Sequence, residues 1–159
     1  GDLGGAAQDF SLAAQSDPEN IAPIAGMARV FLAGGEPDKA KELLQHVPED
    51  KKSDPAVQAA LTALKLTEEA GDAGEAGELE QKLADNPGDH ATRFELANAL
   101  AGKGDLQGAS DQLFHILEAE ADWEEGKAKA RLLEIFEAAG FASPVAKTGR
   151  RRLSTLLFS

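Results

Sequence analysis

The chain has 159 residues, 42% of them hydrophobic and 28% charged, a composition typical of a globular domain large enough to form one core. It contains no cysteine, which excludes disulfides, thiol redox chemistry and thiolate metal sites within these residues. The formal net charge of −12 argues against nucleic acid or an anionic membrane as the main partner.

A hydrophobic pattern with the period of an α-helix runs along almost the whole chain. The helices that it predicts cover, in chain order, about Leu3–Gln15, Ile21–Ala33, Pro37–His46, Pro55–Ala70, Ala73–Ala84, His90–Gly102, Leu106–Ala119, Trp123–Ala139 and Pro144–Phe158. They group into one domain with a partial repeat at 1–16, repeats at 17–54, 55–88 and 89–121, and a terminal helix pair at 122–159. Asp54-Pro55 and Ser143-Pro144 each place a capping side chain before a proline in the first turn of a helix.

A glycine that precedes an acidic residue marks the turn inside each predicted pair. These glycines are Gly1, Gly35, Gly71 and Gly104, and Gly140 closes the series, so the spacings are 34, 36, 33 and 36 residues. Alanines follow the first four glycines by five residues, at Ala6, Ala40, Ala76 and Ala109. Seven residues before the last four glycines lie Ala28, Leu64, Ala97 and Leu133.

The physical interpretation of this register is a pair of antiparallel helices in each repeat. Glycine ends the first helix in a left-handed conformation, and the acid caps or charges the start of the second. The small alanine lets the two helices approach closely. The sequence therefore predicts an all-α helix-turn-helix solenoid, a right-handed superhelix, with a C-terminal capping helix.

The repeat at 55–88 departs from this pattern. Thr67 and Glu80 occupy positions that are apolar in the other repeats, and Leu64 replaces a small residue. Two interpretations stay open: a solenoid unit that tolerates drift, or a local opening that exposes apolar surface.

Residues 86–119 closely resemble the tetratricopeptide repeat pattern, through His90-Ala91-Thr92-Arg93-Phe94-Glu95-Leu96-Ala97 followed by Gly104-Asp105 and Ala109. Asp89–Ala97, Trp123 with Ala130–Glu137, and the ending Gly149–Ser159 also resemble the thioredoxin-like co-chaperones of the YbbN or chaperedoxin family. That resemblance implies a thioredoxin-fold domain upstream, a cytoplasmic bacterial protein, and binding of unfolded clients and of Hsp70 or chaperonin-type chaperones. The alternatives are a purely architectural or oligomerisation module, or a regulatory repeat region of an unrelated enzyme.

Neither an active site nor a metal or cofactor site is predicted. The three histidines, His46, His90 and His115, are scattered without a helical i, i+4 pair, and the glycines fall at helix ends rather than in a phosphate loop. No nucleophile stands with a base, and the many carboxylates are expected on solvated faces. The chain is therefore predicted not to be an enzyme.

The inner groove of the array is the first candidate for partner binding, because the first helix of each pair lines it. Its expected residues are Ala25, Arg29 and Leu32 in one repeat and Phe94, Asn98 and Ala101 in another. Some tetratricopeptide domains clamp a terminal carboxylate with Lys and Asn here, but no Lys stands one turn before Asn98. A mildly apolar groove for extended or helical segments is expected instead.

The C-terminal tail is the second candidate. Residues 141–159 hold Lys147 and Arg150–Arg152 and no acid, whereas the rest of the chain carries −16. Leu153, Leu156 and Leu157 could cover the last repeat, or Arg150, Arg151, Leu156, Leu157 and Phe158 could dock on a partner. Both roles are compatible if Val145 and Leu153 pack inward while Phe158 projects.

Overall fold

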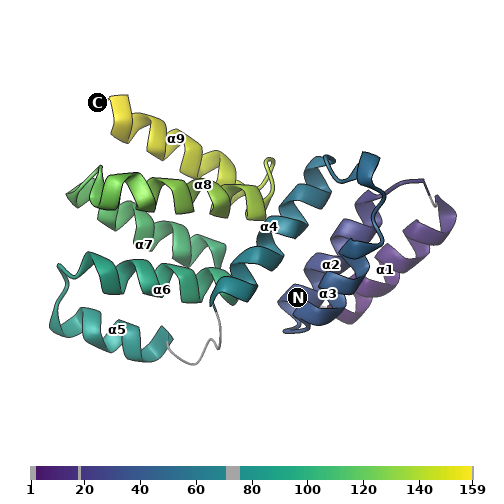
Figure 1. Ribbon diagram of the computed structural model, residues 1–159, viewed down its shortest axis with the longest axis horizontal. Helices are drawn as coiled ribbons and strands as arrows, with labels where there is room; N and C mark the ends of the chain where they lie inside the picture. Colours follow the sequence, from purple (N-terminus) through teal and green to yellow (C-terminus); the bar gives the residue numbers. More distant parts are fainter. Residues whose placement is uncertain (1–2, 18, 71–75, 159) are drawn as a thin grey trace.

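The computed structural model describes residues 3–17, 19–70 and 76–158, and these residues form helices and no strand (Figure 1). The α-helices are α1 (Leu3–Ser16), α2 (Ala22–Ala33), α3 (Pro37–Gln45), α4 (Pro55–Ala70), α5 (Ala76–Asp85), α6 (His90–Gly102), α7 (Leu106–Ala119), α8 (Lys127–Ala139) and α9 (Pro144–Phe158). Two short 3-10 turns, Glu49–Lys51 and Trp123–Gly126, precede α4 and α8. The predicted all-α fold is confirmed.

Helix ends follow the local signals in most places. Gly35, Gly104 and Gly140 have the positive φ angles, 75°, 83° and 89°, that a helix-ending glycine provides. The carboxylate of Asp54 and the hydroxyl of Ser143 accept hydrogen bonds from the first turns of α4 and α9, at 2.8 and 3.1 Å. Gly71 and the expected start of a helix at Ala73 lie outside the described residues.

One local prediction is met in part and another is wrong. Glu36 makes no side-chain cap, but it places a negative charge at the start of α3, where it forms an ion pair with Lys39. The expected continuous helix at 123–139 is interrupted, because Glu124 and Glu125 have φ angles of 45° and 57°. Gly126 is left-handed as well, so the chain turns before α8 begins at Lys127.

Helix α4 belongs to two hydrophobic cores. Val57, Ala60 and Leu64 pack with α2 and α3, around Ala25, Ala28 and Leu44. Leu66, two residues beyond Leu64, instead joins the larger core of α6, α7, α8 and α9. Figure 1 shows α4 between the α1–α3 group and the α5–α9 group.

Helix α5 packs against α6 rather than sharing a core with α4. Its buried residues Ala76, Leu79 and Leu83 form a small cluster with Leu96 and Ala99 of α6. Glu80 is exposed at the border of the buried face of α5, and the Thr67 hydroxyl donates a hydrogen bond to the Ala63 carbonyl within α4. The residues that depart from the repeat pattern therefore lie on α4 and α5, two helices that bury their apolar residues mainly against helices of other repeats.

Helix α9 lies against α8 and α7 at the edge of the molecule (Figure 1). Its inner face consists of Ala146, Gly149 and Leu153, all buried. Gly149 lies directly on the Phe136 ring of α8, because a Cβ at this position would overlap the ring. The last helix thus covers the main core, as a capping helix does.

Candidate functional site

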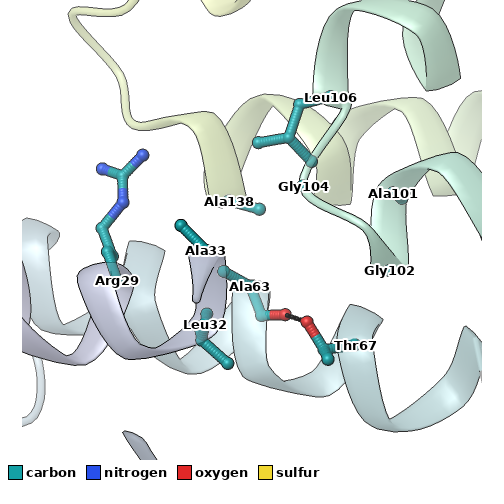
Figure 2. Close-up of a pocket in the computed structure, with 10 residues that line it drawn as sticks. All are labelled: Arg29, Leu32, Ala33, Ala63, Thr67, Ala101, Gly102, Gly104, Leu106 and Ala138. Carbon is teal, nitrogen blue, oxygen red and sulfur yellow. Dashed lines mark hydrogen bonds between the residues drawn. The ribbon is translucent and has the colours of Figure 1, made fainter. Parts of the chain in front are cut away.

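A small hollow lies where α2, α4, α8 and the turn after α6 meet (Figure 2). Its volume is about 120 Å³, and its lining residues are Arg29, Leu32, Ala33, Ala63, Thr67, Ala101, Gly102, Gly104, Leu106 and Ala138. Small-molecule pockets usually offer roughly 300–1,000 Å³. This hollow accommodates at most a small side chain.

Three residues of the predicted groove, Arg29, Leu32 and Ala101, meet in this hollow. Arg29 is exposed, and its Nη2 donates a long hydrogen bond of 3.4 Å to the carbonyl of Ala139 at the end of α8. The guanidinium of Arg29 therefore connects α2 to α8 at the rim of the alanine-lined hollow.

Phe94 and Asn98, which were also predicted to line the groove, are less accessible to a ligand than Arg29. Phe94 is buried in the main core, 5.4 Å from the Trp123 ring between centroids, and the Lys127 ammonium lies 4.9 Å from the Phe94 centroid. Asn98 is half-buried, and its Oδ1 is buried without a hydrogen-bond partner among the described residues. Neither residue lines the hollow at Arg29.

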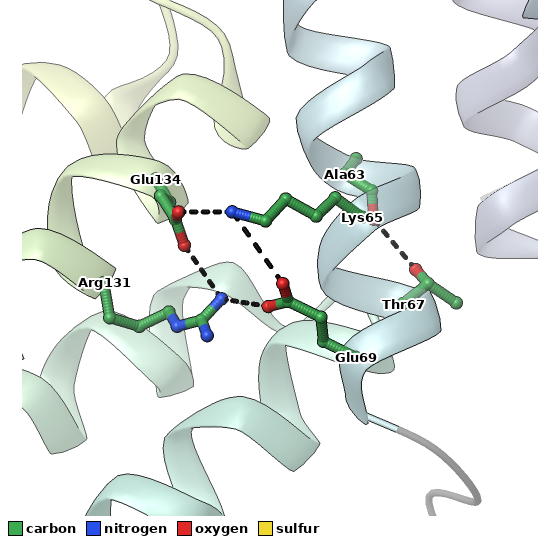
Figure 3. Close-up of polar contacts among 6 residues, drawn as sticks. All are labelled: Ala63, Lys65, Thr67, Glu69, Arg131 and Glu134. Atoms are coloured by element: carbon green, nitrogen blue, oxygen red, sulfur yellow. Dashed lines mark hydrogen bonds and ion pairs between the residues drawn. The ribbon is translucent and has the colours of Figure 1, made fainter.

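Four alternating charges join α4 to α8 (Figure 3). Lys65 Nζ lies 2.6 Å from Glu134 Oε1, and Arg131 Nη1 lies 2.7 Å from Glu69 Oε2 and 2.8 Å from Glu134 Oε2. The hydrogen bond to Glu134, followed by the Coulomb attraction of that carboxylate, raises the pKa of the exposed Lys65. These ion pairs connect α4 directly to α8.

The three arginines of the tail point in different directions. Arg152 pairs with Glu118 at 2.6 Å and stacks over the Phe114 ring at 4.2 Å, so it faces α7. Arg150 stacks over Phe141, with its guanidinium carbon 4.5 Å from the ring centroid. Arg151 is exposed, and its side chain has no ion pair within the described residues. Of the two predicted docking arginines, Arg151 is the one available to a partner.

The apolar residues of the tail also divide into two sets. Leu153 is buried, while Val145 and Leu156 are half-buried against the same core. Leu157 and Phe158 are exposed, Phe158 to 86% of its surface. The helix therefore covers the core with one face and presents an apolar tip to solvent.

Sequence reasoning missed two exposed apolar residues beside the tail, Leu133 on α8 and Phe141 in the turn before α9. They line a hollow of about 350 Å³ together with Pro55, Gln58, Glu137 and Arg150. Leu133 falls on the repeat register, which suggested a core position. Phe141 directly follows the turn glycine Gly140. A large aromatic residue in a turn was the sequence feature that could have indicated its exposure.

Among the described residues, no group of three or more His, Cys, Asp or Glu is placed to hold a metal ion. No helix in the described part of the chain is both long and apolar enough to cross a membrane. The described helices pack on their neighbours along the chain, which is the architecture of a helical-repeat protein.

Comparison with known proteins gives the family. Tetratricopeptide repeat family models match residues 69–158 and residues 1–64, and the chain therefore belongs to the tetratricopeptide repeat family. Such repeats generally mediate protein–protein interaction and are typically non-catalytic. Among solved structures, a domain of a Vibrio parahaemolyticus protein of unknown function is 24% identical, with a TM-score of 0.49, over 98% of this chain and 92% of that chain. No curated protein matches the chain.

Proposed function

We propose that this chain is the protein-binding module of a cytoplasmic, thioredoxin-like co-chaperone. Its partners would be unfolded clients or a folding chaperone of the Hsp70 or chaperonin type, as the sequence resemblance implies. The observation that carries the proposal is the tip of α9, where exposed Leu157 and Phe158 follow the unpaired Arg151.

The tip combines an apolar anchor with a charge that steers binding. Lys147, Arg151 and Phe158 are spaced by four and seven residues, so they lie on one face of α9. An aromatic anchor supplies binding energy when a partner desolvates it, and adjacent cations accelerate approach to an acidic surface. Because Ala146, Gly149 and Leu153 hold the opposite face in the core, the tip is presented on a rigid support.

The test compares Phe158→Ala and Arg151→Glu with the unchanged chain, using purified chaperonin and purified Hsp70 in separate binding titrations. Each substitution is expected to weaken binding to one of these chaperones by about tenfold, at an unchanged melting temperature. Leu12→Ala, at an exposed apolar side chain on the distant α1, is the matched control and should bind normally. Equal affinity of all four proteins for both chaperones would refute the proposal.

Arg150 and Arg152 are unsuitable for this test. Their stacking on Phe141 and Phe114 means that substitution changes stability as well as charge. A loss of binding in those variants would therefore not separate docking from unfolding.

A further inference from the structure

Exposed apolar side chains concentrate on one edge of the molecule. Of the six large apolar residues that are exposed in the described part of the chain, four lie on α8, α9 or the turn between them: Leu133, Phe141, Leu157 and Phe158. Phe141 is 75% exposed and Leu133 47%. A terminal repeat that ended the stack would be expected to present a polar outer face.

The repeat register shows that Leu133 lies where a neighbour is missing. The equivalent residues in the earlier units, Ala28, Leu64 and Ala97, are all buried, because adjoining helices pack over them. Leu133 holds the same position before the last turn glycine but remains half-exposed. The first turn of α4 borders this side of α8 and α9 through Pro55 and Gln58, but it leaves Leu133 47% exposed.

A trough runs along this side, which we define by Leu133, Glu137, Phe141, Arg150 and Leu157. The first four line the hollow of about 350 Å³ described above. Leu157 follows Arg150 by seven residues, about two helical turns, and therefore continues the same side of α9. Apolar side chains thus stand at both ends of the trough, with the aliphatic stem of Arg150 between them.

The charges beside the trough select the partner. Arg150 lines the hollow and Lys147 precedes it by three residues on the same side of α9, a helix without an acidic residue. Glu137 is the one acid that lines the hollow, so α9 makes this edge basic on a chain of net charge −12. Symmetric docking of a second copy would place this basic edge against the same basic edge. An acidic partner gains attraction here instead.

We propose that the α8–α9 trough binds an acidic amphipathic helix of a partner protein, which adds to the stack as a further repeat helix would. Its apolar residues contact Leu133, Phe141 and Leu157, and its carboxylates lie beside Lys147 and Arg150. The proposal rests on the proposed protein-binding function but depends on residues other than the Phe158 tip. Apolar anchors at helical spacing are how an amphipathic helix occupies a groove.

The probe is a labelled synthetic peptide of about 20 residues, long enough to form a helix, with leucines on one face and glutamates elsewhere. Fluorescence anisotropy with the full chain measures its affinity. Leu133→Ser and Phe141→Ser are each expected to weaken binding by about tenfold. Leu133→Ser, at a half-exposed position, should keep the melting temperature of the unchanged chain. Phe141→Ser also removes the ring on which Arg150 stacks, so its binding is compared with that of Leu133→Ser at a temperature where both variants are folded.

The matched control is Leu12→Ser, because Leu12 is an equally prominent apolar side chain (63% exposed) on the distant α1. It should leave binding unchanged. A peptide with the same composition but scattered leucines, and one with lysines in place of glutamates, should both bind at least about tenfold more weakly. Equal binding of these peptides, or equal losses in the Leu12 and Phe141 variants, overturns the proposal.

Two further outcomes separate the possible failures. If the unchanged chain sediments as a dimer and Phe141→Ser makes it monomeric, the occupant is a second copy and the proposal is wrong. If the acidic peptide fails to bind while chaperones still bind through Phe158, the trough proposal alone is refuted. Peptide binding without chaperone binding supports the trough and removes the co-chaperone proposal.

Discussion

Gly149 and Gly77 are both helical glycines, but their surroundings differ. A Cβ at Gly149 would overlap the buried Phe136 ring, whereas a Cβ at Gly77 meets no atom within 4 Å. Gly149→Ala is therefore expected to lower the free energy of unfolding by about 1–3 kcal/mol through overpacking. Gly77→Ala should raise it by up to about 1 kcal/mol through helix propensity. Urea denaturation of both variants checks the contrast, and similar stability changes would mean that α9 does not pack closely on α8.

Asp89 links the stability of α6 to pH. Its carboxylate accepts hydrogen bonds from the Thr92 hydroxyl at 2.7 Å and the Thr92 amide at 3.1 Å, and these bonds lower the pKa of Asp89. A lowered folded-state pKa gives a stabilising contribution that is present above the unfolded value of 3.8 and is lost as the pH falls through the folded value.

We therefore expect Asp89→Ala to melt below the unchanged chain at pH 5–7, with the difference shrinking as the pH falls from about 4 to about 2. Thermal melts across this range measure the effect. Glu80→Ala, at an exposed position on α5, is the control and should show no such convergence. A difference that stays constant down to about pH 2 would contradict the assignment of the cap to the carboxylate form.

At the scale of elements, the contact between α4 and α8 depends on charge. Arg131 is the most buried member of the four-charge network, with 18% of its side chain exposed, and it contacts both Glu69 and Glu134. A double-mutant cycle with Arg131→Met and Glu69→Gln should give a coupling free energy of about 0.5–1 kcal/mol. The coupling should shrink in about 1 M NaCl, where the Debye length is near 3 Å.

The Lys52–Glu49 pair provides the comparison for that cycle. Glu49 is almost fully exposed, and the pair lies within one short turn, so its coupling should be close to zero. If both pairs give the same coupling, the α4–α8 network is no more than an ordinary surface contact.

Local signals predicted individual helices well. Glycine at positive φ and Asp or Ser before proline depend on a few neighbouring residues, so Gly35, Gly104, Asp54 and Ser143 could be assigned from the sequence. The turn at Glu124-Glu125 could not, because two glutamates in the left-handed region have no compositional signature.

Pairing between elements was harder to predict, because it depends on contacts far apart in the sequence. The period near 34 residues predicts that α4 and α5 form one repeat, and it gives no sign that α4 also contacts α8 through Lys65 and Glu134. In the candidate site, too, some features follow from the local sequence and others depend on distant contacts. The tail residues Arg151 and Phe158 were predicted from charge and composition, whereas the exposure of Leu133 depends on a neighbour that its repeat position does not reveal.

At the scale of the whole molecule, α4 is the structural link between two cores. The larger core contains the fully buried Phe114, Phe136 and Leu132. The smaller core is built from α2, α3 and the first half of α4, and the adjoining α1 has no fully buried residue. Because a repeat array is held together by contacts between neighbours, the two ends need not share the same local stability.

Leu64 and Leu66 test this division directly, since they lie two residues apart on α4 but in different cores. Leu64→Ala and Leu66→Ala should each cost about 2–5 kcal/mol locally, as large-to-small core substitutions do. Hydrogen exchange measured by mass spectrometry should show faster exchange in α2 and α3 for Leu64→Ala, with little change in α7. Leu66→Ala should instead accelerate exchange in α6 and α8. In both variants α1 should exchange fastest, because it has the least buried surface. Identical exchange profiles for the two variants would mean that α4 transmits stability along its whole length and that the chain unfolds as one cooperative unit.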